Sequence, residues 1–237
     1  MKRVAVERKV LSENDRIAGQ LRERFCAHDV VCLNLISSPG AGKTSLLERT
    51  LEGFPTGERV AVLTGDIQTD HDATRLARFG FPVRQITTGG ACHLDAHLVH
   101  AALHEIRLRD VDVLFIENVG NLVCPATFDL GQHRNVALLS HTEGDDKPAK
   151  YPVLFRTADL VLLTKSDLAP HLDDFDAARA ERCVRALANP APVFALSARR
   201  GAGMRPWLDW IRAEFEAARH KQHGEERAHD QREAMAR

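Results

Sequence analysis

The clearest pattern along the chain is a series of short, almost entirely apolar runs. Six of them have the length and composition of buried strands, and they lie at 30–36, 60–63, 83–86, 111–116, 136–139 and 160–163. A run at 193–196 is a candidate for a seventh. Strands that are buried on both faces read as continuous apolar runs, so the pattern predicts a mostly parallel sheet.

Helical patterns occupy several of the intervals between these runs. We expect helices at 44–51, 72–79, 94–108, 173–187 and 204–218. Gly80 follows the second of them, where a glycine commonly ends a helix. Strands that alternate with helices indicate an α/β fold in which helices flank a central sheet on both faces.

The chain divides into three parts of unequal length. Residues 1–29 are expected to form a helical N-terminal extension, because Ser12 precedes apolar positions at helical spacing. Residues 30–219 are expected to form one P-loop domain, which also carries the metal ligands discussed below. Residues 220–237 are polar and charged, which predicts a disordered tail.

Composition and charge narrow the class of protein. The 237 residues are 44% hydrophobic and carry a formal net charge of −1, without the basic excess that is typical of nucleic-acid-binding domains. No apolar run approaches the roughly 20 residues of a membrane helix, and no signal-peptide pattern is visible. The five cysteines are scattered and odd in number, which favours free thiols or metal ligands over disulfides. We therefore expect a cytoplasmic protein without nucleic-acid or membrane partners.

A glycine-rich turn joins the first strand to the first of these helices. It reads Ser37-Ser38-Pro39-Gly40-Ala41-Gly42-Lys43-Thr44. This strand–turn–helix context is that of a phosphate-binding P-loop, although a serine replaces the first glycine of the motif. The alternative, an ordinary glycine-rich turn, does not explain why Gly-Lys-Thr directly follows a buried strand.

Each residue of the turn has an expected role toward a nucleoside triphosphate. The backbone amides of Gly40, Ala41 and Gly42 can surround phosphate oxygens, because glycine adopts positive φ without strain. Lys43 is expected to reach the β- and γ-phosphates, and the Thr44 hydroxyl to ligate Mg²⁺. The next residue, Ser45, completes the predicted phosphate-binding set.

A second motif distinguishes GTP from ATP. Thr164, Lys165 and Asp167 directly follow a buried strand with the spacing of the guanine-reading N/T-K-x-D motif. An Asp carboxylate accepts from guanine N1–H and N2–H, whereas adenine N1 presents a lone pair that repels it. Ser197 and Ala198 follow the last strand and match the secondary base loop of GTPases. The alternative is a lysine–aspartate turn on the surface.

Acidic residues at two further strand ends complete the predicted hydrolytic site. Glu117 and Gly120 resemble the D-x-x-G element, with Glu117 near Mg²⁺ and the Gly120 amide sensing the γ-phosphate. Asp66 is a candidate for a second carboxylate near Mg²⁺, and Asp70 a weaker one for orienting water. For both aspartates the alternative is a helix cap or a strand-end charge.

The hydrolysis rate is expected to be low. Asn121, rather than glutamine, follows Gly120, and no arginine finger can be identified in the sequence. Unassisted switch GTPases of this kind turn over at about 10⁻⁴ to 10⁻² per second. Such a rate suits a switch better than a metabolic enzyme.

Three soft ligands occur near these motifs. Cys92 and His93 lie at a glycine-led helix start, and Cys124 lies four residues beyond Gly120. Thiolates and imidazole suit Zn²⁺ and can also bind Ni²⁺. Isolated cysteines are more often small buried hydrophobic residues, but the position of Cys124 would link loss of the γ-phosphate directly to a metal ligand.

Taken together, these motifs resemble one known family. The resemblance rests on residues 37–44, 64–70, 90–96, 117–125 and 143–148, which occur in the order found in the hydrogenase nickel-incorporation GTPases, the HypB family. It runs from about residue 30 to 215. It implies a GTPase that forms homodimers around nucleotide and delivers nickel to the large-subunit precursor of a [NiFe]-hydrogenase, with a second nickel-binding maturation protein as partner.

The resemblance also implies roles for particular residues. Cys92, His93 and Cys124 match the metal site of the family at the dimer interface, and Lys147 lies in a segment that is expected to reach toward the partner's nucleotide. The Cys-x-x-Cys-Gly-Cys motif and the histidine-rich tract of some relatives do not occur in this sequence, so a separate nickel store is not expected.

Three alternatives have different signatures. A urease accessory GTPase would carry a Cys-Pro-His motif, whereas here Cys92 is followed by His93. A non-enzymatic metal store would have no use for an intact P-loop. A small-molecule kinase is disfavoured by the guanine motif at Asp167. Turnover of GTP without a phosphate acceptor, together with stoichiometric metal binding, separates these alternatives.

Overall fold

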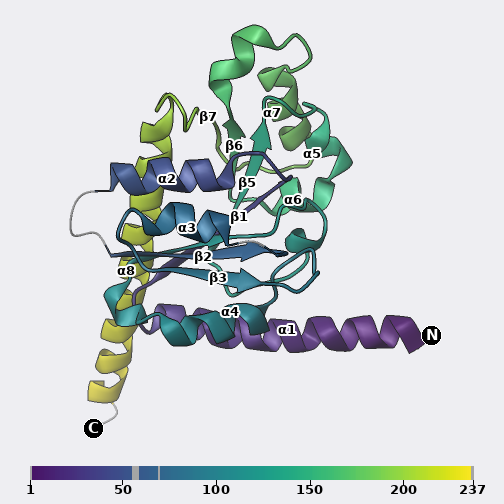
Figure 1. Cartoon of the computed structure of the whole chain (residues 1–237). Helices are drawn as coiled ribbons and strands as arrows, with labels where there is room; N and C mark the ends of the chain where they lie inside the picture. Colours follow the sequence, from purple (N-terminus) through teal and green to yellow (C-terminus); the bar gives the residue numbers. More distant parts are fainter. Residues whose placement is uncertain (1, 55–58, 69, 236–237) are drawn as a thin grey trace.

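A seven-stranded parallel sheet forms the centre of the computed structural model (Figure 1). The structure describes the backbone of residues 2–54, 59–68 and 70–235, and side chains within 9–54, 59–68 and 70–220. The strands are β1 Val31–Ser37, β2 Val60–Asp66, β3 Val83–Thr87, β4 Val113–Glu117, β5 Arg134–Ser140, β6 Leu160–Thr164 and β7 Val193–Ala195. All seven apolar runs are therefore strands, and their order across the sheet is β3-β2-β4-β1-β5-β6-β7.

Helices cover both faces of this sheet. The α-helices are α1 Lys2–Cys26, α2 Lys43–Gly53, α3 His71–Ala77, α4 Ala96–Ala102, α5 Lys147–Lys150, α6 Pro152–Thr157, α7 Ala177–Ala186 and α8 Met204–Met235. Buried side chains of α2, α3 and α8 pack on one face of the sheet. Those of α1 and α4 cover part of the other face, and those of α6 and α7 cover the rest. The predicted α/β fold is confirmed.

Several predicted helix boundaries differ from the structure. The helix expected at 94–108 is the short α4, followed by the 3₁₀ turns Leu103–Glu105 and Leu108–Asp110, since buried Leu103 and Leu108 bring the chain back toward the sheet. The helix expected at 173–187 begins only at Ala177, where the Asp176 carboxylate caps the Ala178 amide. The short helices α5 and α6 were not predicted from the sequence.

Long helices form both ends of the described chain. Residues from Lys2 onward belong to α1, so Ser12 lies inside this helix, where its hydroxyl donates to the Lys9 carbonyl. From residue 220, where the sequence predicted a disordered tail, the backbone continues α8 to Met235. Alanine, glutamate, arginine and glutamine dominate this tail, and all four favour helix.

Helix α1 packs beside α4 and helps to place the loop before it (Figure 1). The Asn14 side chain of α1 accepts from the Ala96 amide at 2.9 Å and donates to the Asp129 carbonyl at 2.9 Å. Leu21 is fully buried, and Gly131 approaches it so closely that an added Cβ would lie 2.7 Å from the Leu21 Cβ. Among the described residues, no helix is long and apolar enough to span a membrane.

Candidate functional site

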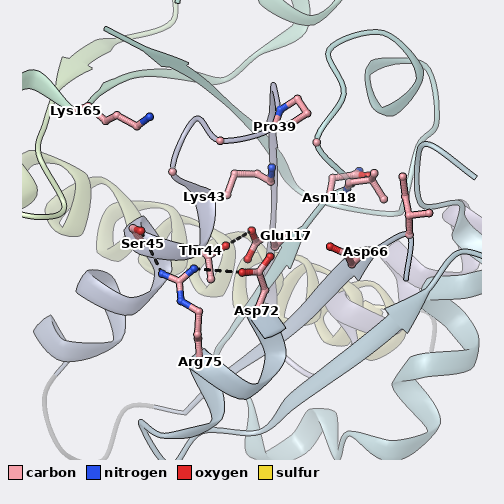
Figure 2. Close-up of a pocket in the computed structure, with 16 residues that line it drawn as sticks. Pro39, Lys43, Thr44, Ser45, Asp66, Asp72, Arg75, Glu117, Asn118 and Lys165 are labelled. Atoms are coloured by element: carbon pink, nitrogen blue, oxygen red, sulfur yellow. Dashed lines mark hydrogen bonds and ion pairs between the residues drawn. The ribbon is translucent and has the colours of Figure 1, made fainter. Parts of the chain in front are cut away.

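The glycine-rich turn borders a cavity of about 490 Å³ at the carboxyl ends of β1, β2 and β4 (Figure 2). Gly40 and Gly42 adopt φ values of 74° and 101°, which residues with a Cβ rarely tolerate. The Lys43 ammonium is buried in the wall of this cavity and donates to Ser37 Oγ at 3.1 Å. Burial lowers the pKa of Lys43, while Glu117 nearby opposes the shift. An anion with several negative charges is the ligand that this arrangement favours.

The buried corner beside Thr44 fits a hydrated Mg²⁺ ion. Thr44 Oγ1 donates to Glu117 Oε1 at 2.7 Å (Figure 2). Glu117 is only 4% exposed, and no described residue forms a hydrogen bond with its second carboxylate oxygen. A hydroxyl beside an unsatisfied carboxylate oxygen provides the hard oxygen ligands that Mg²⁺ prefers.

Of the two aspartates predicted from the sequence, Asp66 lines the cavity and Asp70 is not among the described residues that line it. The Asp66 Oδ1 accepts from the Gln68 amide at 2.9 Å. Asp70 is exposed directly before α3, outside this described lining, so its role in orienting water stays a prediction. Asp72 and Arg75, which the sequence analysis missed, line the cavity instead.

Arg75 is the cation that α3 brings to the nucleotide cavity. Its guanidinium lies 3.4 Å from Asp72, donates to Ser45 Oγ at 3.3 Å and pairs with Glu48 at 2.8 Å. The signal in the sequence was the i, i+3 spacing of an acidic and a basic residue at the start of a helix. Spacing of this kind is common on exposed helices, so it did not distinguish a cavity residue from a surface pair.

Titration of Glu117 leads to a prediction about pH. Burial is the main cause that raises the pKa of Glu117 to about 7, and Lys43 and Thr44 oppose it. The carboxyl therefore contributes stability that is complete below about pH 4.5 and is lost as the pH rises through about 7. Because Mg²⁺ binds the ionised form, we expect Mg²⁺–nucleotide binding to release a proton near pH 6.5.

Calorimetry in two buffers of different ionisation enthalpy measures this proton. Glu117→Gln keeps the size of the side chain and cannot titrate, so it provides the matched control. Binding by the wild-type protein without proton release at pH 6.5 would show that Glu117 is already ionised in the free protein.

The predicted guanine-reading residues surround a second cavity of about 240 Å³ next to the first. Lys165 and Asp167 follow β6 and line it together with Ala41, Ser197 and Ala198. The Asp167 carboxylate accepts from Ser197 Oγ at 2.5 Å, which is the main cause that lowers the pKa of Asp167. An ionised carboxylate therefore lines this cavity, where guanine N1–H and N2–H would need an acceptor.

Thr164, which lines the same cavity, also contacts the phosphate loop. Its side chain is buried, and its hydroxyl donates to the Ala41 carbonyl at 2.6 Å. Lys165 follows with φ of 58°, and its ammonium lies 3.3 Å from Thr142 Oγ1. The hydrogen bond of Thr164 thus fixes the base loop to the phosphate loop, while the bend at Lys165 turns the chain toward the base cavity.

Exchanging the acceptor at Asp167 is expected to change the preferred base. In Asp167→Asn the carboxylate becomes an amide that can donate, so xanthosine triphosphate should gain affinity relative to GTP by about two orders of magnitude. Competition of the two nucleotides for the purified variant measures the change, and the neighbouring Ser166→Ala provides a control. An unchanged preference for guanine would mean that another residue reads the base.

The three soft ligands predicted from the sequence lie together in space. One ligand atom from each of Cys92, His93 and Cys124 falls within 4.8 Å of the others. The two sulfur atoms are 3.2 Å apart, and Cys92 Sγ lies 3.8 Å from His93 Nδ1. Cys92 is exposed and Cys124 is half-buried, so the group opens to the surface.

The surroundings of this group favour metal binding. Burial lowers the pKa of His93, whose ring lies tilted against that of Phe128 with 4.0 Å between the ring centroids, and a neutral imidazole is the form that binds metal. The hydrogen bond with Cys92 is the main cause that raises the pKa of the Cys124 thiol. Two thiolates at this distance repel each other, and a soft cation between them would remove that repulsion.

The metal ligands are close to the segment Glu117–Gly120, which is expected to sense the γ-phosphate and is called the phosphate-sensing segment below. Cys124 begins a 3₁₀ turn, Cys124–Ala126, that follows Gly120 after three residues. Gly120 packs so tightly on the phosphate loop that an added Cβ would lie 2.9 Å from the Pro39 Cα. Asn121 Nδ2 lies 3.4 Å from the Cys92 carbonyl. The segment Gly120–Asn121 therefore contacts both the phosphate loop and the loop that carries Cys92 and His93, which we call the metal loop.

Lys147 lies outside both nucleotide cavities. Its ammonium pairs with Glu143 at 2.7 Å and donates to Ser38 Oγ at 2.9 Å. Ser38, Gly120 and Lys147 line a shallow surface depression on the outer side of the phosphate loop. Lys147 thus does not reach the nucleotide cavity of its own chain.

Comparison with known proteins agrees with this geometry. Residues 31–195 match the model of the CobW/HypB/UreG nucleotide-binding domain. The chain is 51% identical over 208 residues, 88% of its length, to the hydrogenase maturation factor HypB of Azotobacter chroococcum, covering 68% of that protein. It is 48% identical to HypB of Escherichia coli K12 over 87% of its own length and 71% of that protein.

Two solved structures have the same fold. HypB of Helicobacter pylori, crystallised in complex with nickel, superposes with a TM-score of 0.82 at 36% identity, covering 86% of this chain and 96% of that chain. HypB of Archaeoglobus fulgidus gives a TM-score of 0.80 at 37% identity, covering 86% of this chain and all of that one. With these matches, its P-loop and its clustered thiols and imidazole, the chain belongs to the HypB hydrogenase maturation factors, P-loop GTPases of the CobW/HypB/UreG family.

Proposed function

We propose that this chain is a GTP-hydrolysing metallochaperone that delivers nickel to the large-subunit precursor of a [NiFe]-hydrogenase. The observation that carries the proposal is the placement of Cys124. This ligand lies 3.2 Å from the other metal-site sulfur and four residues beyond Gly120, which packs on the phosphate loop. Loss of the γ-phosphate would free the loop around Gly120 and so alter the metal site.

The chain's own residues have distinct roles toward GTP. The amides of Gly40, Ala41 and Gly42 bind phosphate oxygens, and Lys43 neutralises the charge that develops on the β- and γ-phosphates. Thr44 and Glu117 would hold Mg²⁺, with Asp66 at the edge of the same site. When bound, Mg²⁺ supplies positive charge that stabilises the phosphoryl oxygens. Asp167 and the Ser197 loop orient the guanine.

Slow intrinsic turnover belongs to the proposal. No lysine or arginine from the described part of the chain, apart from Lys43, Arg75 and Lys165, lines the triphosphate cavity. Arg75 is engaged by Glu48 and Asp72, which opposes its use as an arginine finger. We therefore expect turnover near the 10⁻⁴ to 10⁻² per second of unassisted switch GTPases.

The proposal includes two kinds of partner. A second copy of the chain would bind across the nucleotide in a homodimer, with Lys147 leaving Glu143 to reach the partner's site. A second nickel-binding maturation protein would supply the nickel ion, and the hydrogenase precursor would receive it. Two exposed apolar side chains support an interface near the metal and nucleotide sites. They are Val123, beside the metal ligand Cys124, and Ile67, beside Asp66.

A urease-directed role is the second candidate. A relative from Helicobacter hepaticus that is 42% identical over 89% of this chain is named a hydrogenase/urease maturation factor HypB. Nickel release from this chain to a urease apoprotein, compared with release to a hydrogenase large-subunit precursor, distinguishes the two targets.

Titration of the purified chain with nucleotide and nickel tests the proposal. GTP turnover without an added phosphate acceptor, one nickel ion bound per site and a mass in solution that doubles with GTP and metal would support it. Stoichiometric nickel binding that does not respond to nucleotide would instead indicate a metal-storage protein. Phosphate transfer to a small molecule would indicate a kinase.

A further inference from the structure

Asn118 is a buried residue whose side chain joins the phosphate-sensing segment to the metal loop. It directly follows Glu117 at the end of β4 and is only 1% exposed. Its Oδ1 accepts from the Val119 amide at 2.9 Å and from the Leu94 amide at 3.2 Å. Leu94 is the residue after the metal-site His93, so one side-chain oxygen holds both segments.

The other end of the same amide is anchored in the sheet. Asn118 Nδ2 donates to Asn34 Oδ1 at 3.2 Å, and Asn34 Nδ2 donates to Asn135 Oδ1 at 3.1 Å. Asn34 is fully buried on β1, the strand that leads into the phosphate loop. The orientation of the Asn118 amide is therefore determined, with the oxygen toward Leu94 and the nitrogen toward Asn34.

Leu94 is held from two sides. Its side chain is fully buried and packs on Gly65 so closely that an added Cβ would lie 2.8 Å from the Leu94 Cγ. Gly65 precedes Asp66 at the end of β2 and lines the nucleotide cavity. Asp66 and Asn118 line the same cavity (Figure 2). The residue next to His93 is thus packed between two strand ends that face the phosphates.

We propose that Asn118 is a positioning residue that transmits the nucleotide state to His93. This inference rests on the proposed coupling between nucleotide and nickel and names the residue that carries it. The contacts form a continuous route, since Pro39 touches Gly120, Gly120 is one residue from Val119, and Asn118 bonds both Val119 and Leu94. When the γ-phosphate displaces Gly120, the shared acceptor moves the Leu94 amide and, with it, the adjoining imidazole.

A purely structural role would have a different result. Loss of packing or hydrogen bonding alone would weaken nickel binding equally in both nucleotide states. A coupling residue changes the ratio of the two affinities, because that ratio measures the interaction between the two sites. Asn14 provides the matched control, since its buried amide also holds the metal-bearing segment, through Ala96, but does not line the nucleotide cavity.

The test is Ni²⁺ titration of the full chain with GDP and with a non-hydrolysable GTP analogue. We expect the wild-type affinities to differ by about fivefold or more between the two states, the range of ordinary allosteric coupling. Asn118→Ala should bring this ratio to within about twofold of one. Asn118→Asp keeps the acceptor for both amides and should retain more of the difference between the two nickel affinities. Asn14→Ala should lower both affinities and leave their ratio unchanged.

The backbone amide of Leu94 provides a second measurement that needs no variant. Its NMR signal in the wild-type protein should shift between the two nucleotide states by more than that of Ala96, which bonds Asn14 instead. A wild-type ratio of one would overturn the proposed function itself. A normal wild-type ratio that survives Asn118→Ala, or a Leu94 signal that does not respond to nucleotide in a responsive wild type, would overturn the role of Asn118 alone.

Discussion

Lys43→Ala is expected to lower GTP turnover by at least about a hundredfold to a thousandfold and to abolish nucleotide-dependent dimerisation. Groups that stabilise transition-state charge contribute effects of this size. The Lys43 ammonium lies at the base of the glycine-rich turn, buried beside Ser37 and the nearby Glu117 carboxylate. Alanine leaves the developing phosphate charge without this cation. Single-turnover hydrolysis and mass in solution measure both effects.

Lys150→Ala is the matched control for this variant. Lys150 is an exposed lysine of α5 that pairs with Asp146 and lines neither nucleotide cavity. Its removal should leave turnover and dimerisation within about twofold of wild type. Lys43→Ala also removes a cation that interacts with buried Glu117, so thermal melting is needed to separate a loss of function from a loss of fold. Normal turnover by a folded Lys43→Ala protein would remove the assignment of this loop.

Cys92→Ala and Cys124→Ala are each expected to weaken nickel binding by at least about a hundredfold while leaving GTP affinity unchanged. Changes in residues that only support metal ligands already cost about tenfold to a hundredfold, so loss of a sulfur ligand should cost at least as much. The two sulfurs lie 3.2 Å apart, so one ion can contact both. Nickel titration and GTP titration of the same preparations measure the two affinities.

Cys183→Ala is the control for these variants. Cys183 is a half-buried thiol on α7, outside the group formed by Cys92, His93 and Cys124. Its loss should leave nickel stoichiometry and affinity unchanged. If Cys92→Ala and Cys124→Ala both retained the wild-type nickel affinity, the two cysteines would be structural, and the chain would be a guanine-nucleotide switch whose cargo lies elsewhere.

Local sequence was sufficient for features whose cause is local. The strands could be recognised because a strand buried on both faces is mainly apolar, as in β1, whose polar residues are Asn34 and Ser37. The phosphate loop was readable because positive φ at Gly40 and Gly42 requires residues without a Cβ. The lengths of helices were harder to predict. Helix α4 ends before Leu103, because burial of Leu103 and Leu108 requires a turn that the local sequence does not indicate.

Some site residues were not predicted, and others were predicted without their main contacts. In each case the contacts involve residues that are far away in the sequence. Asp72 and Arg75 line the cavity because α3 packs beside α2, whereas Asp70, two residues before Asp72, is not among the described residues that line it. Thr164 belongs to the base motif, but its hydroxyl bonds the phosphate loop. Lys147 carries no sequence signal of its contact with Ser38, which is 109 positions away.

The sequence by itself determined that this chain is an α/β P-loop GTPase of the HypB family, because strand hydrophobicity, glycine geometry and ordered motifs are properties of short segments. Only the tertiary structure decided how the nucleotide and metal sites meet. The strand order places β4 between β2 and β1, which brings Asn118 beside Leu94 and Asn34 and packs Gly65 on Leu94. Contacts between strand ends depend on the register of the whole sheet, and no short stretch of residues contains that register.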